Sequence, residues 1–455
     1  MYGKIKRIHF VGIGGIGMSG IAEVLLNLGY TVSGSDLKDS DTVGRLRDLG
    51  AVISIGHKGE NVSGAGVIVI SSAVNETNPE VVEARRCGIP VIPRAQMLAE
   101  LMRLRYGIAV AGSHGKTTTT SMVAAVLSHG GLDPTIVVGG KVKTLGTNAR
   151  LGKGSFMVVE ADESDGSFLL LSPVISVLTN IDEEHLDHYK GLSELVEAFS
   201  IFADKIPFYG LSVFCADCPR VRGIAKNFEK RSVTYGFHPE AELRAENVRI
   251  SGFNTGFEAV LNGSPLGRIS LNVPGRHNAQ NALAAIAVGM ELGMSFGDIR
   301  DGLAEFRGID RRLQIKGRGR DILVLDDYAH HPNEIKATIK AVRDSGLGRI
   351  VAIFQPHRYS RTKLLFDDFA DVLQDIDVLY LMDIYPAGEE PIEGVTSRSL
   401  YESVKKKGHG NVHYSNGSEN LVSLVLGTIR PGDVVITLGA GNVWSVGEKI
   451  AEEIA

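Results

Sequence analysis

The chain has 455 residues, of which 44% are hydrophobic and 22% are charged, and its formal net charge is −5. At ~150 residues per domain this length suggests about three domains, and the composition is typical of a soluble globular protein. The negative charge gives no basic footprint for nucleic acid, and no run reaches the ~18 apolar residues needed to cross a bilayer. We therefore expect a cytoplasmic protein with no nucleic-acid or membrane partner.

Cysteine usage agrees with a reducing compartment. The three cysteines, Cys87, Cys215 and Cys218, are too few for a disulfide framework. Cys215 and Cys218 have the spacing of half a zinc site, but a structural zinc needs a second ligand pair, and none is obvious nearby. The pair is interpreted as two ordinary thiols.

The first hundred residues alternate between strands and helices. Buried strands are predicted at 5–11, 31–34, 67–70 and 90–92, as in a parallel sheet. Between the first two lies a glycine loop, Gly12-x-Gly14-x-x-Gly17, followed by a helix to about Leu28, and Asp36 ends the second strand. This pattern fits the dinucleotide fingerprint. Alone it indicates NAD or FAD, but any diphosphate satisfies the same physics, because a helix N-terminus attracts charge whatever the base.

A second glycine-rich loop follows the predicted strand 108–111 and opens a helix. Its glycines let backbone N–H groups point at phosphate oxygens, its lysine neutralises phosphate charge and its threonine reaches Mg²⁺. The usual spacing has glycine at position 110, where this chain has valine, so the loop is a variant. This phosphate loop consists of Gly112, Ser113, His114, Gly115, Lys116, Thr117 and Thr118.

Acidic residues follow the next predicted strands, 156–159 and 174–178. Glu160 and Asp162 come after the first of these, and His185 comes after the second. The carboxyl ends of parallel strands face one crevice, so Glu160 or Asp162 is a candidate Mg²⁺ ligand. His185 is a further candidate, although Mg²⁺ prefers oxygen.

Residues 211–273 change to an alternating pattern with an Asn262-Gly263 turn, which predicts antiparallel strands. An alanine-rich helix from Asn278 to about Met290 follows. Asn278 and Asn281 lie on the same face of this helix. They could both bind a ligand, or one of them could cap the helix.

The last third of the chain is again α/β. Strands are predicted at 322–325, 350–354, 378–382 and 434–438, and polar clusters follow the first two. Such clusters indicate a site facing the crevice, where Arg358 and Arg361 would clamp a carboxylate.

Together these residues resemble the Mur ligases, the ATP-dependent amide-forming enzymes of peptidoglycan synthesis, over essentially the whole chain. The phosphate loop, Glu160, His185, Asn278, Asn281, Arg312 and Asp327 each fall on a family position. Segments 160–165, 326–331 and 355–361 are similar to the signatures of the members that add L-alanine to UDP-N-acetylmuramate. The first glycine loop would then hold the UDP diphosphate and not NAD.

The strand and helix pattern predicts three α/β domains with boundaries near 105 and 310, and the resemblance implies what each of them binds. Residues 1–105 would form a Rossmann-like, UDP-sugar-binding domain with a parallel sheet. Residues 106–309 would form a P-loop ATPase-like, ATP-binding domain with additional antiparallel strands. Residues 310–455 would form a Rossmann-like domain that binds the amino acid and closes over ATP.

The resemblance also implies the reaction and the site. ATP would phosphorylate the lactyl carboxylate of UDP-N-acetylmuramate, and the amine of L-alanine would attack the acyl phosphate. Lys116, Glu160 and His185 would be catalytic, and Thr117, Glu160 and His185 would hold Mg²⁺. Asn278, Asn281, Arg312 and Asp327 would bind ATP with the phosphate loop. Tyr328, His330, His357, Arg358 and Arg361 would bind the amino acid. The UDP-sugar residues would be Gly12, Gly14, Gly15, Gly17, Met18, Asp36, Ser71, Ser72, Thr147 and Asn148.

Three alternatives stay open. A nicotinamide-dependent dehydrogenase would use the first glycine loop but leaves the phosphate loop without a role. A nucleotide switch that only hydrolyses ATP leaves the histidine and arginine clusters unexplained. A related ligase would attach a preformed peptide to the same UDP-sugar. The split site implies that domain closure assembles it and excludes water.

Overall fold

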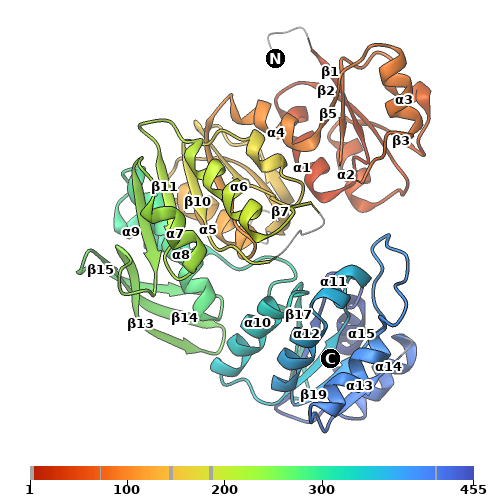
Figure 1. The fold of residues 1–455 in the computed structure, drawn as a ribbon, viewed down its shortest axis with the longest axis vertical. Helices are drawn as coiled ribbons and strands as arrows, with labels where there is room; N and C mark the ends of the chain where they lie inside the picture. The colour runs from red at the N-terminus through yellow and green to blue at the C-terminus, as the bar shows by residue number, and fades with distance from the viewer. Residues whose placement is uncertain (1–4, 72, 143–146, 184–187, 416–417) are drawn as a thin grey trace. The chain divides into compact units, whose positions relative to one another are not determined.

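The computed structural model describes residues 5–71, 73–142, 147–183, 188–415 and 418–455. The chain folds into two compact units (Figure 1). The first comprises Met1–Val248, Gly256–Leu271 and Ala279–Arg307, and the second comprises Arg249–Thr255, Asn272–Asn278 and Gly308–Ala455. The described strands form three sheets.

The N-terminal sheet has the strand order β3-β2-β1-β4-β5, and every neighbouring pair is parallel. The chain leaves β1 for β2 on one side and later adds β4 on the other side of β1. The loop after β1 therefore lies at a topological switch point, where open α/β sheets bind ligands. The strands are β1 (Arg7–Val11), β2 (Thr31–Asp36), β3 (Val52–Ile55), β4 (Val67–Ile70) and β5 (Val91–Pro93). The helices are α1 (Ile16–Asn27), α2 (Asp41–Asp48), η1 (Gly59–Val62), α3 (Pro79–Arg86) and α4 (Arg94–Met102).

The central sheet has the order β15-β14-β13-β12-β11-β10-β6-β9-β7-β8. Strand β6 pairs in parallel with β9 on one side and β10 on the other, so the carboxyl ends of these three strands adjoin. The strands in this part are β6 (Tyr106–Ala111), β7 (Thr135–Val142), β8 (Thr147–Arg150), β9 (Phe156–Glu160), β10 (Ile175–Leu178), β11 (Leu211–Cys215) and β12 (Ser232–Gly236). The helices are α5 (Lys116–His129), η2 (Ser167–Leu170), α6 (Leu192–Asp204), α7 (Pro219–Lys226), α8 (Arg276–Glu291) and α9 (Phe296–Glu305).

The predicted antiparallel strands are present at one end of this sheet. Strands β14 (Asn254–Leu261) and β15 (Ser264–Leu271) are joined by Asn262 and Gly263 and follow β13 (Leu243–Ser251). Asn262 and Gly263 have φ values of 49° and 79°, as a two-residue hairpin turn with both central residues left-handed requires. The antiparallel pair β7–β8 at the other end was not predicted.

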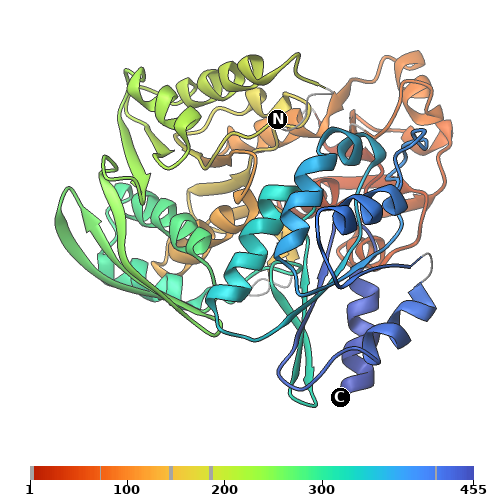
Figure 2. The same cartoon turned by 60° about the horizontal axis from the view of Figure 1, so that its bottom comes forward.

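The sheet of the second unit has the order β16-β17-β21-β18-β19-β20, parallel except for the β16–β17 pair. Apolar residues alternate between its faces, and helices cover both (Figures 1 and 2). Its strands are β16 (Gln314–Gly319), β17 (Ile322–Asp327), β18 (Ile350–Phe354), β19 (Val378–Leu381), β20 (Val412–Tyr414) and β21 (Val434–Leu438). Its helices are α10 (Pro332–Asp344), α11 (Tyr359–Leu364), α12 (Phe366–Val372), η3 (Leu373–Asp375), α13 (Ser397–Lys406), α14 (Ser418–Leu426) and α15 (Trp444–Ile454).

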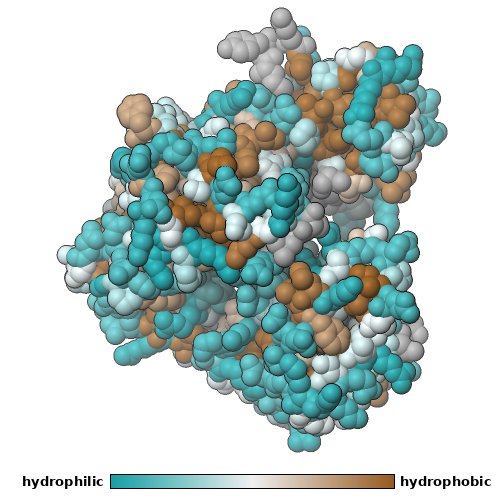
Figure 3. Space-filling view, in the orientation of Figure 1, coloured by the Kyte–Doolittle hydropathy of each residue, from teal (hydrophilic) through white to brown (hydrophobic). Residues whose placement is uncertain are grey.

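The buried apolar residues belong to the strands of these sheets and to the helices that pack on them. In contrast, most of the second unit's visible surface in Figure 3 is hydrophilic. Within the described part of the chain, no helix combines the length and apolar character that a membrane span needs. Four of the strands that the sequence did not predict, β3, β8, β16 and β20, lie at sheet edges, where polar and exposed residues weaken the apolar pattern. Strand β7, also not predicted, lies next to the edge strand β8.

The close packing of α9 against α5 depends on a glycine, and this gives a first prediction. A Cβ at Gly302 would lie 2.8 Å from the Val126 Cα, whereas a Cβ at Gly297 on the same helix would meet only the Ser295 Oγ, at 3.6 Å. We expect Gly302→Ala to lower the midpoint of thermal unfolding by about 2–6 °C, because α9 must move away from α5. Gly297→Ala should leave the midpoint unchanged or raise it, because alanine favours helix. A midpoint for Gly302→Ala at or above that of the wild type would contradict this packing.

Candidate functional site

The phosphate loop connects β6 to α5 in a conformation that only glycine allows at two positions. Gly112 and Gly115 have φ values of 133° and 79°. A Cβ on Gly112 would lie 2.1 Å from the Thr179 Oγ1, and one on Gly115 would lie 2.9 Å from the Asn281 Oδ1. Glycine at position 112 thus allows both the left-handed turn and the close approach of the residues that follow β10. Val110, where the usual motif has glycine, is a fully buried residue of β6.

The residues after β10 hold this loop through hydrogen bonds. The Asn180 side chain accepts from the His114 N–H at 2.8 Å and donates to the His114 carbonyl at 3.0 Å. The Thr179 hydroxyl donates to the same carbonyl at 2.7 Å, and the Asp182 N–H donates to the Ser113 hydroxyl at 2.9 Å. The His114 ring lies 2.9 Å from the Asp182 carboxylate. These contacts order the loop before any phosphate arrives.

Lys116 is paired inside the unit. Its ammonium donates to the carbonyls of Gly112 and Ser113, at 2.5 and 3.0 Å, and to the Glu163 carboxylate at 2.9 Å. Burial lowers the pKa of Lys116, but the charges of Glu163 and Glu160 outweigh burial and hold the pKa above its ordinary value. Burial raises the pKa of Glu163 to about 7 against the pull of Lys116. We assign the charge to Lys116, because all three ammonium donors face oxygen acceptors.

Thr117 and Glu160 offer the oxygen ligands that Mg²⁺ prefers. The Thr117 hydroxyl donates to the Glu160 carboxylate at 2.9 Å, so the two groups meet between α5 and the end of β9. Among the described residues no group of three or more His, Cys, Asp or Glu side chains could hold a metal. Mg²⁺ usually takes one or two carboxylates plus substrate phosphates and waters, so the Thr117 hydroxyl and the Glu160 carboxylate are suitable ligands for it. His185, the third predicted ligand, lies outside the described residues.

The two asparagines of α8 have different partners. The Asn281 Oδ1 accepts from the Thr119 hydroxyl at 3.2 Å, which ties α8 to the helix of the phosphate loop. The Asn278 amide donates to the Pro274 carbonyl at 2.7 Å. Both side chains are buried. Asn278 belongs to the second unit and Asn281 to the first.

The first glycine loop is held by the end of β2. The Ser35 carbonyl accepts from the N–H groups of Gly12 and Ile13, at 2.8 and 3.0 Å. The Asp36 carboxylate accepts from the Gly14 N–H at 2.8 Å. Asp36, a predicted ligand residue, therefore shapes the loop itself, and a Cβ on Gly14 would lie 2.9 Å from this carboxylate.

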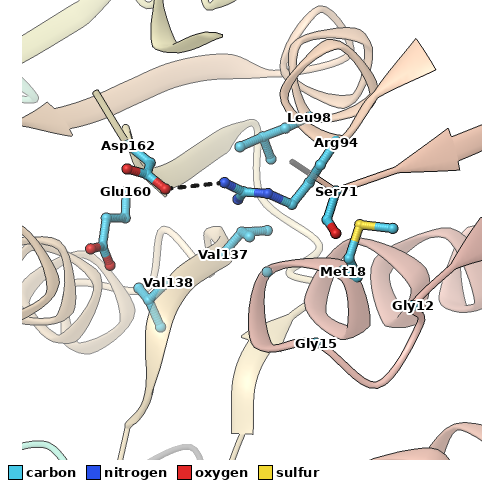
Figure 4. Close-up of a pocket in the computed structure, with 11 residues that line it drawn as sticks. Gly12, Gly15, Met18, Ser71, Arg94, Leu98, Val137, Val138, Glu160 and Asp162 are labelled. Carbon is cyan, nitrogen blue, oxygen red and sulfur yellow. Dashed lines mark hydrogen bonds and ion pairs between the residues drawn. The ribbon is translucent and has the colours of Figure 1, made fainter. Parts of the chain in front are cut away.

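A pocket of about 310 Å³ extends from this loop toward the end of β9 within the first unit (Figure 4). Arg94, from the start of α4, crosses it to donate to the Asp162 carboxylate at 3.2 Å. Burial raises the pKa of Asp162, but the charges of Lys116 and Arg94 outweigh burial and lower it overall. The pocket is lined by Gly12, Gly15, Gly17, Met18, Ser71, Arg94, Leu98, Val137, Val138, Glu160 and Asp162.

The lining includes five of the predicted UDP-sugar residues, Gly12, Gly15, Gly17, Met18 and Ser71. Ser72, also predicted, lies outside the described residues. Thr147 and Asn148 lie in β8, and their side chains fall outside the described part of the chain.

In the second unit, Asp327 at the end of β17 is a fixed buried carboxylate. It accepts from the N–H groups of Leu313 and Ala329, at 2.7 and 2.9 Å. Burial raises its pKa to about 6 against the pull of Arg312. Arg312 and Arg311 stack on the Tyr328 ring, with distances of 5.6 and 4.8 Å from the guanidinium carbon to the ring centroid. The sequence did not single out Arg311, which also donates to Asp326 at 3.2 Å.

The predicted amino-acid residues cluster after β17 and β18. The rings of Tyr328 and His330 lie 5.2 Å apart, and those of His330 and His357 lie 5.8 Å apart. Burial and the charges of His330, Arg361 and Arg358 lower the pKa of His357 to about 3, so its ring is neutral and accepts from Arg361 at 3.3 Å. The result is a neutral imidazole beside two guanidinium groups, an arrangement suited to a small carboxylate ligand.

Sequence reasoning missed Arg94, Glu163, Asn180 and Asp182 as site residues. Glu163 carried a detectable signal, because it follows Glu160 in the same acidic segment. Asn180 and Asp182 directly follow a predicted strand, which is also a readable signal. Arg94 carried none, since it is 68 residues from its partner Asp162.

Family models match three consecutive parts of the chain. Residues 7–106 match the Mur ligase family catalytic domain, residues 110–289 the Mur ligase middle domain, and residues 311–441 the Mur ligase glutamate ligase domain. The UDP-N-acetylmuramate–L-alanine ligase of Geotalea uraniireducens is 57% identical over 454 residues, covering 100% of this chain and 99% of that protein.

Solved structures agree. The UDP-N-acetylmuramate-alanine ligase of Thermotoga maritima has a TM-score of 0.84 at 30% identity and covers 98% of both chains. A murein peptide ligase from Psychrobacter arcticus has a TM-score of 0.71 at 25% identity and covers 99% of this chain and 98% of that one. These matches confirm the predicted fold class of three α/β domains. The chain belongs to the Mur ligase family.

Proposed function

We propose that this Mur ligase joins L-alanine to the lactyl carboxylate of UDP-N-acetylmuramate and converts ATP to ADP and phosphate. One observation carries the proposal: a single pocket runs from the first glycine loop to Glu160 and Asp162, beside the phosphate loop. A sugar nucleotide held by its diphosphate at one end would present its carboxylate at the other. The alanine-adding relative from Geotalea uraniireducens supports this substrate pair.

In the first step, the acceptor carboxylate attacks the γ-phosphorus of ATP, and ADP leaves. Lys116 offsets the charge that develops on the transferring phosphoryl group, and the ordered backbone of the phosphate loop positions it. Thr117 and Glu160 would hold Mg²⁺, which supplies further charge stabilisation on the phosphate oxygens. Lys116 must exchange its contacts with its own loop for contacts with phosphate, because all three of its donors are already engaged.

In the second step, the amine of L-alanine attacks the acyl carbon, and phosphate leaves from the tetrahedral intermediate. We assign the alanine carboxylate to Arg358 and Arg361 of the second unit. The neutral ring of His357 adds no positive charge that would repel the ammonium of the incoming amino acid. Asn278, Asn281, Arg312 and Asp327 remain our proposed contacts to ATP.

We propose that residues 1–105, 106–309 and 310–455 serve the UDP-sugar, ATP and the amino acid, respectively. Because the reaction consumes ATP and a nucleotide sugar, we propose a cytoplasmic enzyme. A peptide-adding ligase is the second candidate, because a murein peptide ligase shares the fold at 25% identity. The arginine pair favours a small free amino acid over a peptide.

The substrate assignment predicts strictly coupled ADP release. ADP should appear only when UDP-N-acetylmuramate and an amino acid are both present, and faster with L-alanine than with glycine, L-serine or an L-alanine-led peptide. The measurement is the initial rate of ADP formation with each substrate omitted or replaced in turn. Equal rates with glycine or L-serine would remove the alanine assignment. ADP release without the acceptor carboxylate would remove the ligase, and tight NADH binding would favour a dehydrogenase.

Arg94 should contribute to binding of the UDP-sugar. It is the one basic side chain among the described residues that line the pocket, where a diphosphate needs a cation. We expect Arg94→Ala to raise the KM for UDP-N-acetylmuramate about 10–100-fold, the value of one or two charge-assisted hydrogen bonds. Arg103→Ala is the matched control, because Arg103 caps the same helix and makes only an exposed pair with Glu100. An unchanged KM for Arg94→Ala would exclude Arg94 from the site.

Asn180 should act on ATP through the phosphate loop. Asn180→Ala removes two hydrogen bonds to His114, so the loop loses order that nucleotide binding must restore. We expect the KM for ATP to rise about 10-fold, while the KM for UDP-N-acetylmuramate changes little. Asn227→Ala is the control, because that exposed amide bonds only within its own turn. An ATP KM equal to the wild-type value would show that the loop is ordered without Asn180.

A further inference from the structure

A buried polar cluster lies in the N-terminal sheet, outside the residues assigned above. Its centre is Glu80 of α3, a carboxylate with 0% exposure. Glu80 accepts from the Ser35 hydroxyl at 2.6 Å and from the Asn61 amide. The rings of His9 and His57 lie 3.7 and 3.4 Å from the same carboxylate.

Ser35 joins this cluster to the first glycine loop. Its side chain faces Glu80, and its hydroxyl also lies 3.0 Å from the His57 Nδ1. Its carbonyl accepts the N–H groups of both Gly12 and Ile13. Glu80 is therefore two hydrogen bonds away from the loop backbone, with one residue as the link. A displaced Ser35 would displace both anchoring points of the loop.

The Glu80 carboxylate lies where a negative charge would weaken the binding of an anion to the first glycine loop. Burial by itself raises the pKa of Glu80, yet the nearby His9 ring and the hydrogen bonds from Ser35 and Asn61 outweigh burial and lower it, so the carboxylate is held ionised. A negative charge beneath a loop that receives a diphosphate opposes binding unless its partners neutralise it. Fold stability alone does not call for this arrangement, because well-packed apolar residues can replace a buried ionic group without loss of stability.

We propose that Glu80 is a positioning residue for the UDP-sugar: it fixes Ser35 and thereby holds the first glycine loop in the conformation that receives the diphosphate. This inference rests on the proposed function, which puts the UDP diphosphate at this loop. Glu80 itself does not touch the substrate.

The test compares Glu80→Gln with Glu83→Gln. Both residues lie on α3, and Glu83 makes only exposed contacts with Arg86 and Cys87. We expect Glu80→Gln to raise the KM and the calorimetric Kd for UDP-N-acetylmuramate about 10-fold. The kcat and the KM for ATP should stay within about twofold, because the diphosphate contributes equally to ground-state and transition-state binding. Glu83→Gln should match the wild type.

A purely structural role predicts a different result. It would lower the thermal midpoint and the apparent kcat of Glu80→Gln through loss of folded enzyme, with the KM for UDP-N-acetylmuramate unchanged. That outcome would overturn the proposal. So would an equal rise in the KM for ATP, because the effect would then not be specific to the first loop.

Ser35→Ala gives a second test, which also serves if Glu80→Gln does not fold. It removes the hydroxyl link and keeps the carbonyl, so it should raise the same KM. The double variant should be no worse than the poorer single variant, because both changes break one link. Multiplying effects would overturn the proposal. If the wild type does not bind UDP-N-acetylmuramate in the calorimeter, the proposed function fails; if it binds and Glu80→Gln binds equally well, only this inference fails.

Discussion

Both glycine loops obey one constraint: a left-handed turn frees backbone polar groups that a neighbouring strand must satisfy. The loop after β1 is held by Ser35 and Asp36 at the end of β2. The loop after β6 is held by Thr179, Asn180 and Asp182 after β10. In each case a parallel neighbour ends in polar residues at the level where the loop begins. Parallel pairing therefore fixes both loops before any ligand binds. Binding then does not have to supply the free energy for ordering the loops, which would otherwise lower the affinity.

Both glycine loops also adjoin a buried carboxylate. Glu80 lies under the first loop and Glu163 beside Lys116, and each has 0% exposure. The two carboxylates have different partners. Glu80 is surrounded by a hydroxyl, an amide and two imidazoles, whereas Glu163 faces the ammonium that a phosphate would claim. Loss of that ammonium would leave Glu163 able to take up a proton, since burial raises its pKa to about 7. The first carboxylate is thus suited to a fixed role and the second to an exchange of partners.

The sequence predicted the strand–loop–helix segments and the residues at strand ends, because both depend on local periodicity and chain order. It predicted Thr117 and Glu160 as partners, and the structure brings them together. It did not predict that the Asp36 carboxylate is occupied by the Gly14 N–H, because the fingerprint places that carboxylate without giving its donor. Arg94 and Glu80 were missed because their partners are 68 and 45 residues away. Such pairings depend on how helices pack over a sheet, which no short pattern encodes.

The backbone of the proposed amino-acid cluster in the second unit is strained at one residue and closely packed around it. Arg358 has a φ of 70°, a conformation that costs about 1 kcal/mol or more for a side chain without a compensating contact. Its N–H donates to the Tyr385 carbonyl at 2.9 Å, and the Tyr385 ring stacks on His357 at 5.7 Å. Gly441 approaches this ring so closely that a Cβ would lie 2.8 Å from its Cγ. A strained arginine, a stacked ring pair and a glycine contact together make a rigid wall. If this cluster binds the amino acid, as we propose, a larger side chain could enter only by breaking contacts that also hold Arg358 in place.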